Sequence, residues 1–428
     1  MMRTFGLILA LLCGIASAQA ASNPALITVV PTVAAMRAIG GAAAQYPNIQ
    51  AAGYYAAGDG GGGIFSWSAT STASPDSCVT FQAVGVATGR YIRQLNNNSI
   101  SLPQCGAKGD GTTNDTAAVQ AAFTSVGTGG IIEVPAASGC YKVLSTISIT
   151  KALTVRGAGC LTWATGGIAG LSASASNVTI AGVTLNGSQH ASQVIAEAAI
   201  NIYGTFRAGL APINLSNINI SNVTISNWGG FGISLGYVSD FTLSGNRVSD
   251  IGYAGIGTVS TVRGVVSGNS IKNIGVGFTP GVTNAYGMYL SRATADSANL
   301  TSQPRSDSIS VLGNVVDNVP TWECYDTHGG SAITFDSNVG TNCYYGISVG
   351  PSNNSAGVST YSSKNVALNG FSLSSISSAG ASGAWPDTIW SRRRPIRPSM
   401  SIWSSCLPTG NASFSAISAE TQGALFGR

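Results

Sequence analysis

The stretch ISNVTISNWGGFGISLGYVSDFTLSGN, residues 220–246, contains a short motif that returns along the chain. Each copy ends a run of β-branched or apolar residues in an Asn or Gly turn, and the copies are Ile180-Ala181-Gly182-Val183, Ile220-Ser221-Asn222-Val223, Leu243-Ser244-Gly245-Asn246, Ser267-Gly268-Asn269, Leu312-Gly313-Asn314 and Asp336-Ser337-Asn338. From Asn222 to Asn338 the intervals are 24, 23, 45 and 24 residues. The interval of 45 indicates one coil with a loop, or two coils of which the middle has lost its motif.

Alternation of period two within each unit predicts strands with one face in a core. A single unit cannot bury that face alone, so units must stack edge to edge. Asn and Gly at the corners tolerate the left-handed backbone that such corners need. An antiparallel sandwich also has many short strands but does not produce a near-constant spacing. We therefore predict an all-β fold, a single-stranded right-handed parallel β-helix (solenoid) over residues 101–376.

A second motif, residues 105–122, precedes the repeats and reads CGAKGDGTTNDTAAVQAA. Asp115 is a good N-cap residue, and Val119, Ala122 and Phe123 form an apolar stripe at helical spacing. The sequence thus predicts a short capping helix from Asp115 to about Val126. Such a helix would cover the open end of the first coil, as the terminal units of a solenoid require.

The first twenty residues have the features of a removable signal peptide. Arg3 provides a positive start, an apolar run extends from Phe5 to Cys13, and Ala18-Gln19-Ala20 is a small-residue cleavage pattern. The apolar run is shorter than the about 20 residues that span a bilayer. No later segment is apolar enough to do so. We expect a secreted protein, extracellular or periplasmic, without membrane insertion, and the signal argues against a phage virion part.

Charged residues make up only 8 % of the chain, against about 25 % in a typical soluble protein. The formal net charge of +4 equals the number of arginines in one part of the C-terminal tail, Arg392, Arg393, Arg394 and Arg397. A neutral body and a signal peptide argue against nucleic-acid binding. We divide the mature chain into a small N-terminal module (21–100), the β-helix, and an irregular basic tail (377–428). Whether that tail is a cap, disordered or a frameshift product stays open, as does the oligomeric state.

Seven cysteines remain once the signal is removed. In an oxidising compartment the local pairs Cys78–Cys105, Cys140–Cys160 and Cys324–Cys343 are plausible disulfides, although sequence alone does not fix connectivity. Cys406 is left over. Because there is no CxxC motif and no Cys/His cluster, we expect no zinc site.

The run in residues 105–122 resembles the opening of the pectate-lyase-like superfamily of right-handed β-helices, which includes polygalacturonase-related proteins, phage tailspikes and alginate epimerases. Upstream, residues 53–63 (GYYAAGDGGGG) look like the small module that often precedes this fold. The resemblance covers about residues 50 to 375. It implies the fold but not the reaction, because this superfold hosts lyases, hydrolases, epimerases and binding proteins.

Catalytic motifs of several relatives are missing: there is no NTD, DD, GHG or RIK in the sequence. Asp326-Thr327-His328 resembles the Asp-Pro-His motif of mannuronan C5-epimerases, with Asp326 and His328 matching its acid and histidine and Tyr325 its inward aromatic. Thr327 replaces the proline, Gly329 replaces the following acid, and Glu323 stands where the family has a functional tyrosine. The other histidine, His190, is interpreted as a solvated turn residue.

Alignment of the second strand of each coil predicts which side chains face outward. Asp326 and His328 project outward together, and small residues above and below them predict a groove. Insertions near residues 275–285 and 293–306 would wall it and bring Arg292 and Arg305 close. Glu323 is expected on the opposite face from Asp326.

The favoured function is a lyase or C5-epimerase acting on a uronate-containing, acidic polysaccharide. Both reactions remove the proton α to the uronate carboxylate. His328 is the candidate base and Asp326 orients or charges it, Tyr289 is the candidate proton donor, and Arg292 or Arg305 the carboxylate clamp. The alternatives are a glycoside hydrolase that uses Glu323 with Asp326, and a non-catalytic carbohydrate-binding or adhesive solenoid. No cofactor is expected, and no motif indicates calcium.

Overall fold

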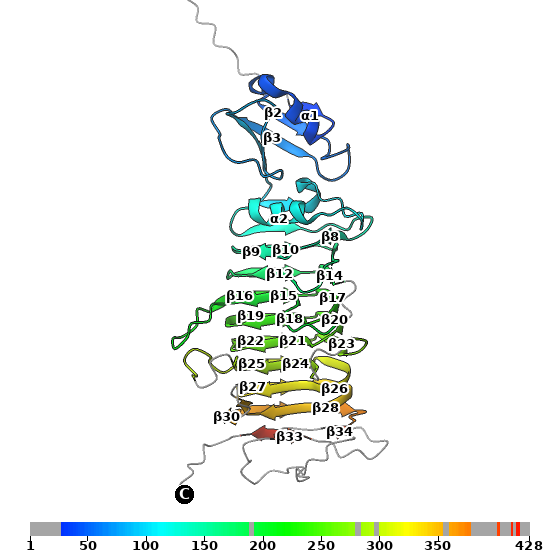
Figure 1. The fold of residues 1–428 in the computed structure, drawn as a ribbon, viewed down its shortest axis with the longest axis vertical. Coiled ribbons are helices and arrows are strands. Elements are labelled where there is room, and N and C mark those ends of the chain that lie inside the picture. Colours follow the sequence, from blue (N-terminus) through cyan, green and yellow to red (C-terminus); the bar gives the residue numbers. More distant parts are fainter. Residues whose placement is uncertain are drawn as a thin grey trace, which may run out of the picture.

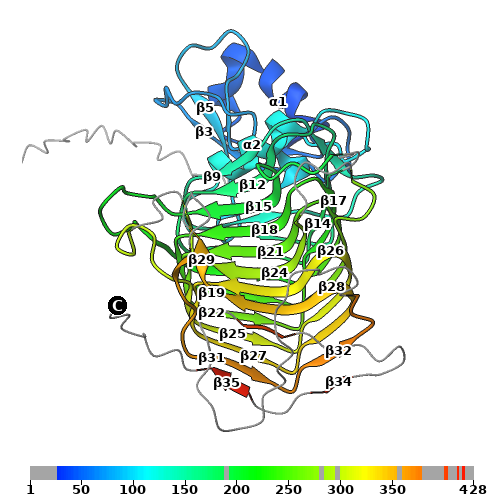
Figure 2. The same cartoon turned by 60° about the horizontal axis from the view of Figure 1, so that its bottom comes forward.

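The structure is a computed structural model that describes residues 27–187, 192–278, 284–294, 299–353 and 359–377, followed by three short strands. The signal peptide, His190 and Cys406 lie outside the described residues. Between residues 99 and 374 the chain winds through coils whose strands pair in parallel with the next coil, so the right-handed parallel β-helix is confirmed (Figures 1 and 2). No helix in the described ranges is long and apolar enough to cross a membrane.

Three faces of stacked strands surround the core. The first face consists of β6 (Ser99–Ser101), β7 (Gly130–Glu133), β10 (Leu153–Arg156), β13 (Val178–Ala181), β16 (Leu215–Ser221), β19 (Val238–Ser244), β22 (Val262–Ser267), β25 (Asp307–Leu312), β27 (Ser331–Asp336) and β31 (Val366–Asn369). The second consists of β8 (Tyr141–Val143), β11 (Cys160–Trp163), β14 (Thr184–Asn186), β17 (Thr224–Trp228), β20 (Arg247–Ile251), β23 (Ser270–Ile274), the first parts of β26 (Val315–His328) and β28 (Val339–Gly350), and β32 (Ser372–Ser374).

The third face carries the candidate site. It consists of β9 (Ile147–Ile149), β12 (Ala169–Ala173), β15 (Ala198–Tyr203), β18 (Phe231–Gly236), β21 (Ala254–Val259), β24 (Tyr286–Ser291) and the later parts of β26 and β28. A short hairpin, β29 (Ser352–Asn353) and β30 (Ser359–Tyr361), follows it. Three strands of the tail, β33 (Met400–Ile402), β34 (Ala412–Ser413) and β35 (Ile417–Ala419), pair antiparallel with β28, β32 and β31.

The long interval in the repeat is one coil that carries loops, because β22 pairs directly with β25. The left-handed positions lie one residue earlier than the motif suggests, at residues such as Gly245, Gly268 and Gly313, with φ of 64°, 61° and 59°. Asn222, with φ of 54°, shares this corner and is therefore out of step with the later asparagines. The left-handed backbone expected at the corner is therefore found at the residue before each of the later asparagines. The side chains of these asparagines point into the core.

Those later asparagines, Asn246, Asn269, Asn314 and Asn338, form a buried column along the helix axis. Each side-chain amide except the last donates to the Oδ1 atom of the next, at 2.9 Å, and all four donate to a backbone carbonyl one coil back. The Oδ1 atoms also accept backbone N–H groups of the preceding coil. Because the amide nitrogen and oxygen of each buried asparagine have hydrogen-bond partners, this column stabilises the corner and avoids the cost of burying unpaired polar groups.

The predicted capping helix is α2 (Thr116–Ser125), with Val119, Ala122 and Phe123 buried as expected. It covers the first coil, below the N-terminal module (Figure 1). Asp115 lies at the N-cap position but makes no capping hydrogen bond. Its carboxylate instead accepts the backbone N–H groups of Lys108 and Gly109, at 2.8 and 3.0 Å, and so fixes the loop before the helix.

The N-terminal module is a five-stranded sheet with two short helices. Its elements are β1 (Thr28–Val30), α1 (Val33–Ala38), the 3₁₀ helix η1 (Gly40–Gln45), β2 (Asn48–Ala51), β3 (Gly63–Ser68), β4 (Thr80–Phe81) and β5 (Arg90–Arg93). A second 3₁₀ helix, η2 (Leu102–Cys105), connects β6 to the loop before α2. The module has a hydrophobic core of its own, separate from the core of the β-helix.

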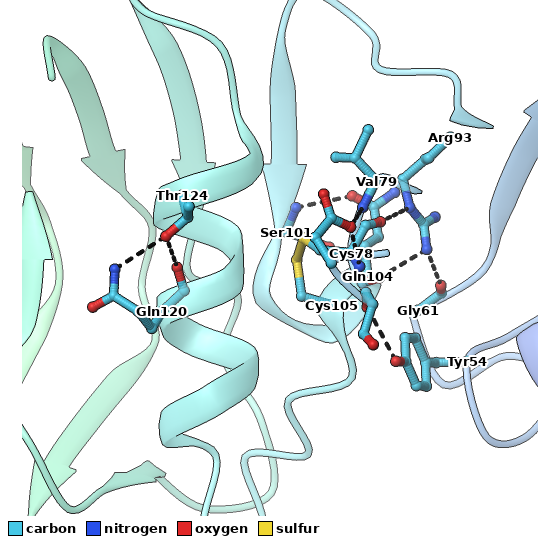
Figure 3. Close-up of a disulfide and its surroundings, with 12 residues drawn as sticks. Tyr54, Gly61, Cys78, Val79, Arg93, Ser101, Gln104, Cys105, Gln120 and Thr124 are labelled. Carbon is cyan, nitrogen blue, oxygen red and sulfur yellow. Dashed lines mark hydrogen bonds between the residues drawn. A yellow bond between two sulfur atoms is a disulfide. The ribbon is translucent and has the colours of Figure 1, made fainter. Parts of the chain in front are cut away.

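A dense set of contacts joins the module to the first coil (Figure 3). The buried guanidinium of Arg93 donates to the carbonyls of Cys78, Gly61 and Gln104, at 2.8, 3.2 and 2.7 Å. The predicted Cys78–Cys105 disulfide lies beside it, and Cys140–Cys160 and Cys324–Cys343 are present as well. All three predicted disulfides are confirmed.

Candidate functional site

The strand ladders of the third face show which side chains share a column. Ile233, Ile256, Met288, Tyr325 and Ile347 stack in register and are buried, as predicted from the alternation. Their neighbours on the outer side are the column Ser234, Gly257, Tyr289, Asp326 and Ser348. Asp326 therefore faces outward, with Tyr289 one coil before it and Ser348 one coil after it.

Glu323 lies on the same outer face as Asp326, so the prediction that they face opposite ways was wrong. Alternation breaks because two successive residues, Cys324 and Tyr325, both point into the core. The ladder skips residue 324 and its equivalents Gly232, Gly255 and Gly287, pairing Tyr286 with Glu323 and then Met288 with Tyr325. A side chain there meets the second face, as a Cβ at Gly287 would lie 2.3 Å from Val316. Small residues, or a cysteine in a disulfide, fit this position.

Both carboxyls are buried, with Glu323 5 % and Asp326 1 % exposed. Burial and, after it, the neighbouring charge of Asp326 together raise the pKa of Glu323 to about 9. Burial likewise raises the pKa of Asp326 to about 8, opposed by hydrogen bonds from Ser291 and Ser348. No lysine or arginine in the described ranges forms an ion pair with either group, and Oε2 of Glu323 and Oδ1 of Asp326 lack a hydrogen-bond partner there.

His328 is the member of this group that reaches solvent, with 39 % of its side chain exposed. Its Nε2 atom lies 3.3 Å from Oδ1 of Asp326, an ion-pair distance without hydrogen-bond geometry. Partial burial lowers the pKa of the imidazole, opposed by the charge of Glu323. The structure thus brings Glu323, Asp326 and His328 together as one acid–base cluster.

The predicted groove over the small residues is filled by flat rings. A Cβ at Gly350 would lie 2.8 Å from the His328 ring, and a Cβ at Gly257 would lie 2.8 Å from the Tyr289 ring. The same is true of Gly236, where the distance to the Tyr203 ring is 2.1 Å. The small residues therefore make room for aromatic side chains that pack against the backbone.

Aromatic side chains lie on both sides of the acid pair along the helix axis. One cluster, the leading platform, consists of Phe231, Tyr253, Tyr286 and Tyr289, with ring centroids 5.2 to 6.3 Å apart. The other, the trailing platform, consists of Trp322, Tyr344 and Tyr345, at 5.4 and 4.5 Å. In the ladder, Glu323 pairs with Tyr286 of the leading platform and with Tyr345 of the trailing one.

Sequence reasoning found no exposed aromatic ladder and so missed these platforms. A usable signal was present, because Phe231-Gly232, Tyr286-Gly287 and Tyr345-Gly346 repeat an aromatic residue before the glycine at the break in alternation. Glu323-Cys324 occupies the same position in the coil between the last two. From Ala198 to Tyr345 this column holds alanine or aromatic residues, and Glu323 is its one acid.

Arg292 and Arg305 both bind backbone carbonyls, Arg292 within its own loop and Arg305 in the segments that follow β26 and β30. Arg292 is buried and donates to the carbonyls of Gln303 and Asn299, at 2.7 and 3.2 Å. Arg305 donates to the carbonyls of Gly329 and Ser362, at 2.8 and 2.5 Å. Both guanidinium groups lie over the ring of Tyr361, with centroid distances of 4.7 and 5.5 Å. These contacts hold the hairpin β29–β30 and the loop before β25 beside His328.

Tyr289 packs within the leading platform, where burial raises the pKa of its phenol well above the usual value. Within the described ranges, no three or more His, Cys, Asp or Glu side chains are placed to hold a metal ion. The titratable groups that the structure brings together at this face are the two carboxyls, the imidazole and the phenols.

One family model matches the N-terminal part of the chain. Residues 29–96 match the model described as "Phage tail protein small four-stranded beta-sheet domain", which corresponds to the small module. Among the curated proteins, none matches this sequence.

Several solved structures are similar in fold. The tailspike protein gp49 of the Acinetobacter baumannii bacteriophage Fri1, a capsular polysaccharide depolymerase, is 13 % identical with a TM-score of 0.49; the match covers 81 % of this chain and 66 % of that one. Pantoea stewartii WceF, a glycan biofilm modifying enzyme with a tailspike-like parallel β-helix, is 15 % identical with a TM-score of 0.49, covering 83 % and 49 %. The catalytic domain of a GH87 α-1,3-glucanase is 15 % identical with a TM-score of 0.44, covering 69 % and 50 %.

This chain therefore spans less than two thirds of the length of each of these proteins. Likeness at this level concerns the β-helix and leaves the reaction open, and the pectate-lyase-like assignment stays a prediction.

Proposed function

We propose that the protein is a polysaccharide-active enzyme that hydrolyses glycosidic bonds with Glu323 and Asp326. The observation that carries this proposal is the pair of buried, mutually repelling carboxyls on one outer face, with no lysine or arginine paired to them in the described ranges. Burying such groups without partners costs stability, and a fold retains them where chemistry needs the shifted pKa values.

Hydrolysis of a glycoside requires one carboxyl that holds a proton and one that has lost it. Because the two charges repel, the pair releases its protons one at a time. Glu323, whose pKa is raised to about 9, keeps its proton longer and gives it to the glycosidic oxygen. Asp326, whose pKa is raised to about 8, ionises first as the pH rises through that value, and its carboxylate then activates water beside His328 at 3.3 Å.

Both carboxyls are almost fully buried, so a neighbouring aromatic side chain must change its rotamer before a substrate can reach them. The rings next to Asp326 are His328, two residues further along the same strand, and Tyr289, its partner in the preceding coil. Rotamer changes of this kind are fast compared with catalytic turnover.

Proton abstraction from a uronate, by lyase or epimerase chemistry, is the second candidate. The observation that favours it is the exposure of His328, whose lowered pKa keeps the imidazole neutral and able to accept a proton. Against this second candidate, the two arginines expected to bind the substrate carboxylate, Arg292 and Arg305, already bind backbone carbonyls. An acidic polysaccharide as substrate stays a prediction on this second route.

The products of the reaction distinguish these candidates. Incubation of the protein with a panel of neutral polysaccharides, alginate and polygalacturonate should yield, from at least one of them, new reducing ends without ultraviolet absorbance. Glu323→Gln and Asp326→Asn should each lower the rate by about 10²–10⁴-fold, the usual contribution of a general acid or base. Glu133→Gln, at a surface ion pair with Arg156 on another face, is the matched control.

An unsaturated product, or altered uronate composition without cleavage, would instead establish the second candidate. In that case His328→Ala should be the most damaging change. Wild-type turnover in Glu323→Gln and Asp326→Asn would refute the hydrolytic proposal.

We also propose that the protein works outside the cytoplasm after export. Three disulfides support this, because such bonds persist in oxidising compartments. Detection of the mature chain in a periplasmic or culture fraction, with no free thiols at these six cysteines, tests it.

A further inference from the structure

We infer that an uncharged glycan chain lies along the helix axis on the third face, with the leading platform on one side of the acid pair and the trailing platform on the other, and is cut internally. The internal cut rests on the hydrolytic function proposed above. The binding of the chain to the two platforms does not.

The first step is the placement of the platforms. Tyr286, Glu323 and Tyr345 are direct partners in successive coils, so the acid lies between two aromatic rings on one line parallel to the axis. From β18 to β28 this line crosses five coils, and strand spacing gives a length of roughly 19 Å. That length accommodates several sugar units of an extended chain. Subsites on both sides of the reacting bond are what an enzyme that cuts within a chain needs.

The second step is the chemistry of the rings. Tyr253, Tyr289, Trp322, Tyr344 and Tyr345 are half-buried, so each presents part of a ring or a phenol at the surface. An aromatic ring offers a flat apolar face to the C–H groups of a sugar, and a phenol offers a hydrogen bond to its hydroxyls. Such surfaces suit a ligand that is apolar on its faces and polar at its edges. A glycan chain has this character throughout its length.

The third step is the charge of the surface. No lysine or arginine in the described ranges forms an ion pair with Glu323 or Asp326. Arg292 and Arg305 are bound to carbonyls and stacked on Tyr361. A polymer with a carboxylate on each sugar would therefore lie beside two acids, protonated or ionised, that no paired cation accompanies. The surface therefore favours an uncharged chain.

Binding can be measured without cleavage in the Glu323→Gln protein. Affinity electrophoresis in gels that contain mixed-linkage β-glucan, galactomannan or dextran tests the neutral class, and gels with alginate or polygalacturonate test the anionic class. We expect retardation by at least one neutral polymer and by neither anionic polymer. Retardation by an anionic polymer alone, or by none of the three neutral polymers, would overturn the inference.

Ring-removing variants locate the binding surface. Tyr253→Leu on the leading platform and Tyr345→Leu on the trailing platform keep apolar bulk but lose the ring, and each should weaken binding about tenfold. If the melting curve of either variant shows that it does not fold, Tyr289→Leu replaces Tyr253→Leu on the leading platform and Trp322→Leu replaces Tyr345→Leu on the trailing one. Tyr46→Ala, at an aromatic residue 37 % exposed in the N-terminal module, should bind as the parent does. Unchanged retardation in the ring variants of both platforms contradicts the assignment.

The mode of cleavage is read from the wild-type protein. A chain held on both sides of the acids should lose viscosity early, with few reducing ends released, whereas release of single sugars from chain ends would overturn the internal cut. A protein that binds a neutral glycan through both platforms but yields no product would keep the binding surface and refute the hydrolytic function. If the ring variants cleave the glycan as fast as the parent, the hydrolytic function stands and the binding surface is refuted.

Discussion

Two sets of buried polar side chains lie in this β-helix, a column of asparagines along the axis and a pair of acids on one strand, and they differ in how they are satisfied. In the asparagine column, residues such as Asn269 and Asn314 donate and accept with the coils on either side, at 2.9 Å. On the third face, Glu323 and Asp326 are also buried, yet each has a carboxyl oxygen without a hydrogen-bond partner in the described part of the chain. Stacking gives each asparagine a partner of the same kind, whereas the neighbours of the two acids in the adjacent coils are tyrosines and a serine.

The difference separates structural from chemical use of the same solenoid geometry. An amide is both donor and acceptor, so identical residues in successive coils satisfy one another. A carboxyl beside another carboxyl cannot do so without holding a proton, and burial makes the ionised form costly. Polar residues that repeat from coil to coil therefore build this fold, and polar residues that interrupt a column are candidates for function.

The largest effect that tests this comparison is a loss of stability on breaking the asparagine column. Asn314→Ala removes donors to Val266 and Asn338 and the acceptor of Asn269, leaving buried groups unpaired. We expect the free energy of unfolding to fall by about 3 kcal/mol or more, measured by urea denaturation. Asp326→Asn, which removes a buried titratable carboxyl, should leave stability unchanged or raised. A comparable loss in both variants would erase the distinction between the column and the acid pair.

Much of this contrast was visible in the sequence, but not all of it. The spacing of 23 and 24 residues predicts the coils, and alternation correctly places Tyr325 inward and Asp326 outward. Alternation fails at Cys324, because a sheet that turns a corner can direct two successive side chains inward. Because of this break, the side chain of Glu323 points outward, where strict alternation would place it inward. Period-two alternation alone cannot predict such a break.

The surroundings of the site were harder to predict for a different reason. From the sequence, glycines in an outward-facing column are interpreted as open space. In the structure, Gly257 and Gly350 lie beneath the rings of Tyr289 and His328. Arginines near the predicted groove are interpreted as ligands for a substrate carboxylate. In the structure, Arg292 and Arg305 bind backbone carbonyls of loops whose positions the sequence does not reveal. Both features depend on side-chain packing across coils, which residue spacing alone does not specify.

A second, smaller effect is the dependence of stability on pH. The folded-state pKa values of Glu323 and Asp326 are raised to about 9 and 8, above the values near 4 of unfolded carboxyls. The folded protein therefore binds more protons than the unfolded chain between about pH 4 and 9, and unfolding becomes easier as the pH rises. The pair therefore stabilises the fold in full below about pH 4, and we expect this contribution to fall by roughly 1 kcal/mol per pH unit for each of the two groups until it is exhausted above about pH 9.

The control for this pH effect is the double variant Glu323→Gln/Asp326→Asn. Its unfolding free energy, measured in urea at pH 5, 6, 7 and 8, should fall less steeply with pH than that of the parent. Other titratable groups are common to both proteins and cancel in the difference. Parallel curves would mean that the two carboxyls are ionised in the folded protein, and the contrast with the asparagine column would be lost.

The smallest effect concerns the fit of His328 against the backbone. Gly350→Ala would place a Cβ 2.8 and 3.0 Å from two atoms of the imidazole, so the ring must tilt away from Asp326. The site lies on the outer face, and stability should change little. If His328 supports Asp326, kcat/KM on the cleaved glycan should fall about tenfold, and its pH profile should shift because the carboxyl loses its neighbour. Gly41→Ala is the matched control, since no atom lies within 4 Å of its added Cβ. A tenfold loss with an unshifted pH profile would assign Gly350 a purely structural role, and an unaffected rate would remove His328 from the site.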